Sequence, residues 1–294
     1  MIGFGRYSVL TMDGVLERRD AVAVVVQAID AGHARRRAAL ELRADSVAQA
    51  LAELGVPEPG ERLIAPRTAH WALALEGFRE ESLLFVDEPT VSAFEQASGA
   101  AGAGGEVWWL VAALEGPELR VPDLRALACA AHGVGARLAV DNTALGRFGC
   151  DALALGADVV IEPAAAPDDA AQQRRFDHAR AVAEYLRCHP RVPRTWYPGF
   201  KANADYQVAA RTLRHGFGPR VVFELPEDVA AAAFLERCEC GRPELPQDGS
   251  LTRLSALDSA DGRLVCLIAG LDDPIDVADD LDQAHRWFCN PPEP

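Results

Sequence analysis

Short apolar runs alternate with longer helical patterns from about residue 61 onward, and this alternation restricts the possible folds more than any other feature. Brief apolar runs bounded by turn-forming or charged residues are typical of buried strands. The expected strands are residues 62–66, 83–87, 107–111, 137–141 and 158–162, and the expected helices are 45–54, 70–78, 91–97, 122–132 and 150–155. Strand and helix in repetition predict a parallel sheet with helices on its faces.

The pattern changes after a long helical stretch at residues 168–188. His189-Pro190 and the Tyr-Pro-Gly at residues 197–199 interrupt it, and a shorter series of helical and strand patterns follows. In this series we expect strands at 220–225 and 264–269 and helices at 204–213, 227–237 and 274–287. The chain is therefore expected to have an N-terminal segment (1–40), a large α/β domain (41–192) and a small C-terminal α/β domain (193–294).

Composition excludes several classes of protein. The chain is 49% hydrophobic and 25% charged, as globular proteins are. Its net charge of −15 repels phosphate backbones and anionic lipids, so we expect neither a nucleic-acid nor a membrane partner. Seven cysteines spread along the chain do not suggest a secreted disulfide framework, and no segment has the pattern of a signal peptide or a membrane span. These observations predict a cytoplasmic protein.

Several motifs occur together in a fixed order. They include Arg-Leu-Ala-Val-Asp-Asn-Thr at 137–143, Ala-Leu-Ala-Leu-Gly-Ala-Asp at 152–158, Gly-Phe-Gly at 216–218 and Leu-Val-Cys-Leu-Ile at 264–268. This series resembles the Cys/Met-metabolism family of pyridoxal-phosphate (PLP) enzymes, which includes cystathionine γ-synthase, the cystathionine lyases and methionine γ-lyase. The resemblance implies the PLP-dependent transferase-like fold (aspartate aminotransferase fold type I), with a mostly parallel sheet in the large domain and a smaller α/β C-terminal domain.

The resemblance also implies a lysine that holds the cofactor as an imine. Counting on from Gly-Ala-Asp at 156–158, the lysine position holds Ala166, and a methyl group cannot form an imine. The only lysine of the chain is Lys201, which follows the Tyr-Pro-Gly motif and is expected to be a solvated loop residue. No catalytic residue is therefore assigned.

Other positions retain part of the family's cofactor site. The resemblance implies that Asp141 corresponds to the partner of the pyridine nitrogen, with Thr143 beside it, and that His70 stands where a tyrosine stacks on the ring. Arg6 corresponds to an arginine that reaches the phosphate in a neighbouring subunit. The residues themselves allow another role, because an Asp-Asn-Thr sequence at a strand end also caps the following turn.

Two further positions have lost their function in this comparison. Asp45 takes the place of a glycine in the loop that cradles the phosphate, where a carboxylate would repel that dianion. Cys266 takes the place of the arginine that clamps the substrate carboxylate, a bidentate contact that a thiol cannot make. The substrate site is therefore expected to be degenerate.

The sequence also contains residues that could suggest two other kinds of site, a zinc site and a hydrolase active site. Cys238 and Cys240, with Cys188, His189 and His215, suggest zinc, but a second closely spaced ligand pair is missing and we expect no metal. A Ser/His/Asp hydrolase rests on composition alone, because no Gly-x-Ser-x-Gly motif is present.

We interpret the chain as a pseudoenzyme, a degenerate homologue of the PLP-dependent transsulfuration enzymes that acts as a binding, partner or regulatory subunit without a cofactor. The alternative is an active lyase or synthase of sulfur amino-acid metabolism that holds PLP non-covalently. A third hypothesis is a reused cleft with other chemistry at His70, Asp141 and Cys266. Because the segment with Arg6 serves a neighbouring subunit in the family and the family's longer N-terminal arm is missing, we expect a homodimer or a heteromer with an active paralogue.

Overall fold

The computed structural model describes residues 8–9, 25–27, 39–44, 46–101, 105–165, 167–242, 249–259 and 261–289. The chain divides into two compact units, the first formed by Met1–Leu114 and Pro122–Ala165 and the second by Glu115–Val121 and Ala166–Pro294. Arg6, Asp45 and Ala166 lie outside the described residues, so the expectations for them stay predictions. Across the described ranges, no helix is both long enough and apolar enough to cross a bilayer.

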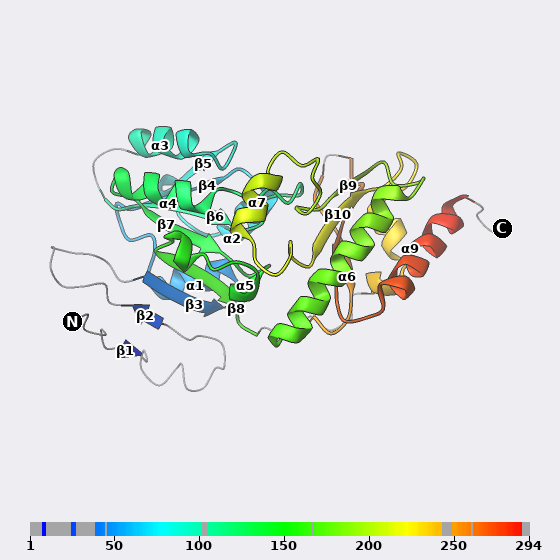
Figure 1. Cartoon of the computed structure of the whole chain (residues 1–294). Helices are drawn as coiled ribbons and strands as arrows, with labels where there is room; N and C mark the ends of the chain where they lie inside the picture. Colours follow the sequence, from blue (N-terminus) through cyan, green and yellow to red (C-terminus); the bar gives the residue numbers. More distant parts are fainter. Residues whose placement is uncertain are drawn as a thin grey trace. The chain divides into compact units, whose positions relative to one another are not determined.

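The first unit is built on a large sheet. Within the described residues its strand order is β1-β2-β3-β8-β7-β6-β4-β5 (Figure 1). The strands are β1 (Ser8–Val9), β2 (Val25–Gln27), β3 (Ala39–Ala44), β4 (Arg62–Pro66), β5 (Leu83–Val86), β6 (Val107–Ala112), β7 (Arg137–Asp141) and β8 (Val159–Pro163). The six from β3 to β5 run parallel, whereas β1 and β2 pair antiparallel at one edge. The predicted parallel α/β sheet is thus confirmed.

Helices cover both faces of this sheet. They are α1 (Val47–Leu54), α2 (Ala69–Ala74), α3 (Val91–Ala100), α4 (Leu124–Gly133) and the short α5 (Gly146–Gly149), with 3-10 turns η2 (Glu80–Ser82) and η3 (Leu153–Leu155). Trp108 packs in the core formed with α1 and α2, whereas the next residue, Trp109, stacks on Phe94 of α3 at 5.0 Å. Because successive strand residues point to opposite faces, α3 lies on the face opposite to α1 and α2.

Strand predictions were accurate where the strand contains an unbroken apolar run. All five expected strands are present within about two residues of the expected ends. β3 was missed because Glu41 and Arg43 alternate with Leu42 and Ala44, so that charged residues interrupt the apolar run. The helix expected at 150–155 was wrong: a 3-10 turn over Leu153–Leu155 stands there instead, ended by Gly156 at φ 105°.

The second unit contains an antiparallel sheet of order β11-β12-β10-β9 among the described residues. Its strands are β9 (Arg194–Trp196), β10 (Arg220–Glu224), β11 (Arg253–Ala256) and β12 (Leu264–Ile268), and its helices are α6 (Asp169–Cys188), α7 (Tyr206–Thr212), α8 (Ala231–Leu235) and α9 (Pro274–Cys289), with η4 (Glu239–Gly241). Helices α6 and α9 lie side by side over one face (Figure 1). The helix expected at 227–237 is shorter than predicted, since α8 spans only the five residues Ala231–Leu235.

The border between the compact units differs from the expected border at 192/193. Helix α6 belongs to the second unit, because Ala179, Val182 and Leu186 pack in one core with Val221 and Phe223 of β10. The His-Pro sequence ends that helix but does not end a core. The sequence pattern indicates where a helix ends, but it does not indicate where one packed core ends and the next begins.

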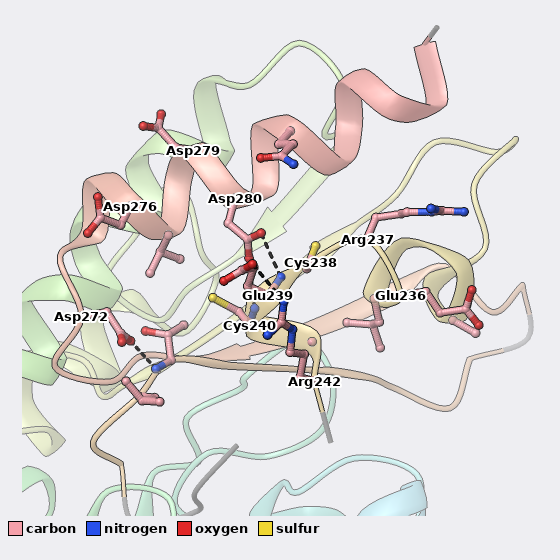
Figure 2. Close-up of a pocket in the computed structure, with 17 residues that line it drawn as sticks. Glu236, Arg237, Cys238, Glu239, Cys240, Arg242, Asp272, Asp276, Asp279 and Asp280 are labelled. Atoms are coloured by element: carbon pink, nitrogen blue, oxygen red, sulfur yellow. Dashed lines mark hydrogen bonds and ion pairs between the residues drawn. The ribbon is translucent and has the colours of Figure 1, made fainter. Parts of the chain in front are cut away.

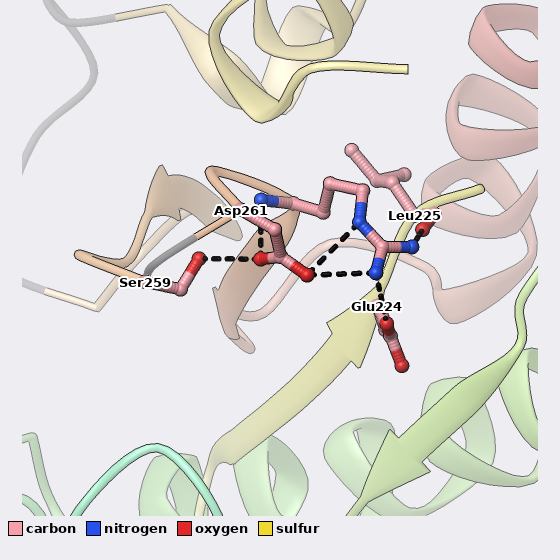
Figure 3. A network of polar contacts seen from close by, with 5 residues as sticks. Glu224, Leu225, Ser259 and Asp261 are labelled. Atoms are coloured by element: carbon pink, nitrogen blue, oxygen red, sulfur yellow. Dashed lines mark hydrogen bonds and ion pairs between the residues drawn. The ribbon is translucent and has the colours of Figure 1, made fainter. Parts of the chain in front are cut away.

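An arginine ties the strands of the second sheet together at one end. Arg263 donates to the Asp261 carboxylate through Nε at 3.0 Å and Nη2 at 2.7 Å, and its Nη1 donates to the Leu225 carbonyl at 3.0 Å (Figure 3). The same Nη2 lies 2.9 Å from Glu224 at the end of β10. This network links the end of β10 to the start of β12 and explains one arginine as a structural residue.

Candidate functional site

Asp141 is the last residue of β7, at the carboxyl edge of the parallel sheet of the first unit, where ligands of open α/β sheets usually bind. Its side chain is only 4% exposed. The Oδ1 atom accepts two hydrogen bonds from Thr143, one from the backbone N–H at 2.9 Å and one from the hydroxyl at 2.6 Å. The carboxylate therefore holds the turn that leaves the strand.

His70 supplies the other contact of this carboxylate. Its Nε2 lies 3.0 Å from Oδ2 of Asp141, and its side chain is 40% exposed. The imidazole comes from the second residue of α2, a helix whose start is capped by the Thr68 hydroxyl, which accepts from the Trp71 N–H at 3.4 Å. Asp141, Thr143 and His70 are thus brought together, and both oxygens of the buried carboxylate have partners within the chain.

The electrostatics of Asp141 follow from these contacts. Burial opposes ionisation, but the hydrogen bond and charge of His70, together with the two hydrogen bonds from Thr143, outweigh it and hold the pKa of Asp141 below its ordinary value. The carboxylate is therefore ionised at neutral pH. An ionised, buried carboxylate requires donors, and this chain supplies them itself.

A second carboxylate lies at the end of the neighbouring strand β8. Glu162 accepts a hydrogen bond at 2.8 Å from Nδ2 of Asn142, which also donates to the Cys150 carbonyl at 2.8 Å. Burial raises the pKa of Glu162 to about 7, and the nearby Glu41 carboxylate adds to this effect, whereas the bond from Asn142 opposes it. Sequence reasoning missed this group, although an acidic residue within a predicted buried strand is a signal for it.

Position 266 lies in the second unit, on β12. Its neighbours across the sheet are Val222 on β10 and Ser255 on β11. Leu119, from the segment Glu115–Val121, forms an apolar cluster with Val222 and Cys266. Burial raises the pKa of the Cys266 thiol, so it stays protonated. Position 266 itself thus offers an uncharged thiol within an apolar cluster, and Arg220 on β10 is the charged residue that acts on it electrostatically.

Lys201 also belongs to the second unit, in an exposed turn after Phe200. The structure thus assigns three of the named residues, His70, Asp141 and Thr143, to a single cluster in the first unit. Lys201 and Cys266 belong to the second unit.

No family model matches the sequence. Among curated proteins, it is 28% identical over 226 residues to cystathionine γ-synthase of Escherichia coli (58% of this chain, 57% of the relative) and 32% identical over 125 residues to cystathionine γ-synthase of Mycobacterium tuberculosis (38% and 32%). The chain therefore spans at most little more than half the length of these relatives.

Solved structures of similar proteins match a larger share of the chain than these sequence relatives do. A methionine γ-lyase from Micromonospora echinospora matches with a TM-score of 0.70 and 22% identity, covering 82% of this chain and 80% of that one. A cystathionine γ-synthase from Xanthomonas oryzae, solved with aminoacrylate and cysteine, matches with a TM-score of 0.68 and 21% identity over 82% and 81%. The sequence and the fold are thus similar to those of cystathionine γ-synthases and lyases.

The match to these solved structures confirms the expected type I fold. The roles of Asp141, His70 and Thr143 at a cofactor, and of Cys266 at a substrate, stay predictions. In this chain the side chains of His70 and Thr143 contact Asp141, and Cys266 packs in an apolar cluster.

A large cavity of about 1080 Å³ lies elsewhere in the second unit (Figure 2). Asp280 accepts from the backbone N–H groups of Glu239 and Cys240 at 2.9 and 3.1 Å, and burial raises the pKa of both Cys238 and Cys240. Within the described part of the chain, no three histidine, cysteine or acidic side chains converge as metal ligands would. The cavity gives no support to the zinc hypothesis.

Proposed function

We propose that this chain is a catalytically degenerate member of the transsulfuration family, acting as a binding, partner or regulatory subunit and not as a lyase or synthase. The observation that carries the proposal is the closed Asp141 carboxylate. Thr143 donates to Oδ1, and the His70 Nε2 atom lies 3.0 Å from Oδ2. Both oxygens of the carboxylate that the resemblance assigns to a pyridine nitrogen therefore already have partners within the chain.

The cofactor therefore does not fit these residues. The first unit contains no lysine, since the only lysine of the chain is Lys201. Position 266 of the second unit offers a protonated thiol under Leu119 and no guanidinium. Both observations support the loss of imine chemistry and of substrate binding. The expected assembly, a homodimer or a heteromer with an active paralogue, is part of the same proposal.

Incubation with PLP tests the proposal directly. We expect no visible absorbance after gel filtration and, after borohydride reduction, no adduct of one per chain in the intact mass. A stoichiometric non-covalent chromophore would support the alternative, an active enzyme without an imine, and would overturn the proposal. An adduct mapped to Lys201 would overturn it as well.

A gain-of-lysine variant separates loss of the imine from loss of the whole site. Ala166→Lys restores the nucleophile but leaves the His70–Asp141 contact and Cys266 unchanged. We expect no turnover of cystathionine or methionine by this variant. Measurable turnover would show that the rest of the site is more intact than proposed and that the loss of activity rests on the lysine alone.

A further inference from the structure

A smaller cavity of the second unit, of about 290 Å³, is lined by the segment Glu115–Val121 and by residues from β9 to α7. Three of its lining residues, Leu119, Val121 and Ala209, are buried and apolar. Sites for small molecules usually enclose about 300–1,000 Å³ behind mostly apolar walls with a few polar groups. The size of this cavity therefore suits a small molecule and not a macromolecule.

Contacts within the chain hold the walls of this cavity in place. The Arg120 guanidinium donates to both carboxylate oxygens of Asp205, the residue before α7, with Nη2 at 3.2 Å from Oδ1. Arg120 and Glu115 also exchange two backbone hydrogen bonds of 2.8 Å, which close their segment into a tight loop. Trp196 packs against the cluster that contains Leu119. The cavity is thus formed before any ligand arrives, which lowers the cost of binding.

Arg194 on β9 supplies a cation that is available to a ligand. Its guanidinium lines the cavity and lies over the Trp196 ring, 4.9 Å from the centroid. Among the described residues it forms no ion pair, and its cross-strand neighbour Glu224 lies 2.9 Å from Arg263 instead. Stacking covers one face of a guanidinium but leaves the N–H groups at its edge available, and these match the two oxygens of a carboxylate.

The acidic residues of the cavity do not oppose an anion strongly. The carboxylate of Asp205 is already neutralised by Arg120, and Glu118 is exposed, so that water screens its charge. The cavity therefore combines an available guanidinium with an apolar wall. An inorganic anion would leave this wall without a contact, whereas a carboxylate with an apolar body uses both parts.

We propose that this cavity binds a small carboxylate with an apolar body, which places its charge on Arg194 and its apolar part against Leu119, Val121 and Ala209. Neither Asp141 nor Cys266 lines the cavity. The inference therefore goes beyond the proposed function and does not depend on it.

The test uses the full chain and isothermal titration calorimetry with benzoate as the probe. We expect saturable binding of one benzoate per chain. Benzamide has the same shape but no charge, and it should bind at least about 10-fold more weakly because it loses the charge-assisted hydrogen bonds. Inorganic phosphate, which has the charge but no apolar body, should not compete with benzoate.

Three variants locate the binding site. Arg194→Gln removes the guanidinium and should weaken benzoate binding about 10-fold or more. Ala204→Phe places a ring at an exposed position that lines the cavity and should weaken binding as well. Arg237→Gln is the matched control, because Arg237 also stacks on an indole, that of Trp287 at 3.9 Å, but does not line this cavity, and its benzoate affinity should equal that of the wild type. Circular dichroism verifies that each variant is folded.

The outcomes separate this inference from the proposed function. The inference would be overturned by absence of saturable benzoate binding, by equal binding of benzamide or phosphate, or by unchanged benzoate affinity in Arg194→Gln and Ala204→Phe. The visible absorbance of bound PLP is a separate measurement. A stoichiometric PLP chromophore in the wild-type protein would overturn the proposed function and leave the carboxylate site standing.

Discussion

The two units differ in the surroundings of Asp141 and Cys266, the positions that the resemblance assigns to cofactor and substrate. In the first, Asp141 keeps its charge, and Thr143 and His70 satisfy it from within the chain. In the second, position 266 carries no charge, and Leu119 packs over the thiol. The Asp141 carboxylate accepts the hydrogen bonds that hold the turn after β7. A guanidinium at position 266 of β12 would instead be buried in an apolar cluster, which is unfavourable for a charged group.

Removing the retained charge should have the largest effect. Asp141→Ala leaves the Thr143 N–H and the His70 imidazole without their acceptor, and we expect a loss of about 3 kcal/mol in the free energy of unfolding. Urea unfolding followed by circular dichroism measures this value. Asp151→Ala, which removes a more exposed cap at the Ala154 N–H, should cost about 1 kcal/mol. Equal losses for the two variants would mean that Asp141 is an ordinary cap.

The second carboxylate of the first unit predicts a pH effect. Glu162 has a folded-state pKa of about 7 against an ordinary value of 4.5, chiefly because it is buried. Between these values the folded state holds a proton that the unfolded state has released, so stability falls as pH rises from about 4.5 to 7 and stays low above it. At alkaline pH, Glu162→Gln should therefore be more stable than the wild type by up to about 3 kcal/mol.

Unfolding curves at a series of pH values check this effect. Glu53→Gln, on the outer side of α1, is the matched control and should keep the wild-type pH profile. A Glu162→Gln variant whose stability relative to wild type does not change between acid and alkaline pH would show that the pKa of Glu162 is the same in the folded and unfolded states.

Restoring charge in the second unit should have a moderate cost. Cys266→Arg forces a guanidinium beneath Leu119 and Val222, and we expect a loss of about 1–3 kcal/mol. Cys266→Val keeps the site apolar and should cost less than about 1.5 kcal/mol. Thermal and urea unfolding of both variants provide the comparison. An arginine variant as stable as the valine variant would mean that this cluster opens easily.

The smallest effect concerns the residue that covers position 266. Leu119 has φ 51°, in the left-handed region that disfavours residues with a Cβ atom. Leu119→Ala and Leu119→Gly remove the same packing, but only glycine relieves this conformation, so the glycine variant should be the more stable by about 1 kcal/mol. Urea unfolding resolves this difference, and the reverse order would show that the backbone relaxes once the leucine is gone.

Much of the fold was predictable because its signals are local. The five predicted strands of the first sheet each contain an unbroken apolar run, and α6 has a long helical pattern. The elements that were missed or misjudged, such as β3 with its alternating charges, depend on partners that a local pattern does not contain. The same holds for α6, whose place in the second unit is decided by its contact with β10.

Local sequence patterns were enough to predict the parallel α/β architecture and the resemblance to the transsulfuration enzymes, and to identify the side chains at the altered positions, including Ala166, Cys266 and Lys201. Three contacts became known from the folded chain alone: that of the His70 ring with Asp141, that of Asn142 with Glu162, and that of Leu119 with Cys266. Each of these contacts joins residues from separate elements. Its geometry is set by how helices, loops and strands pack together, and neither the propensity nor the periodicity of a segment contains that information.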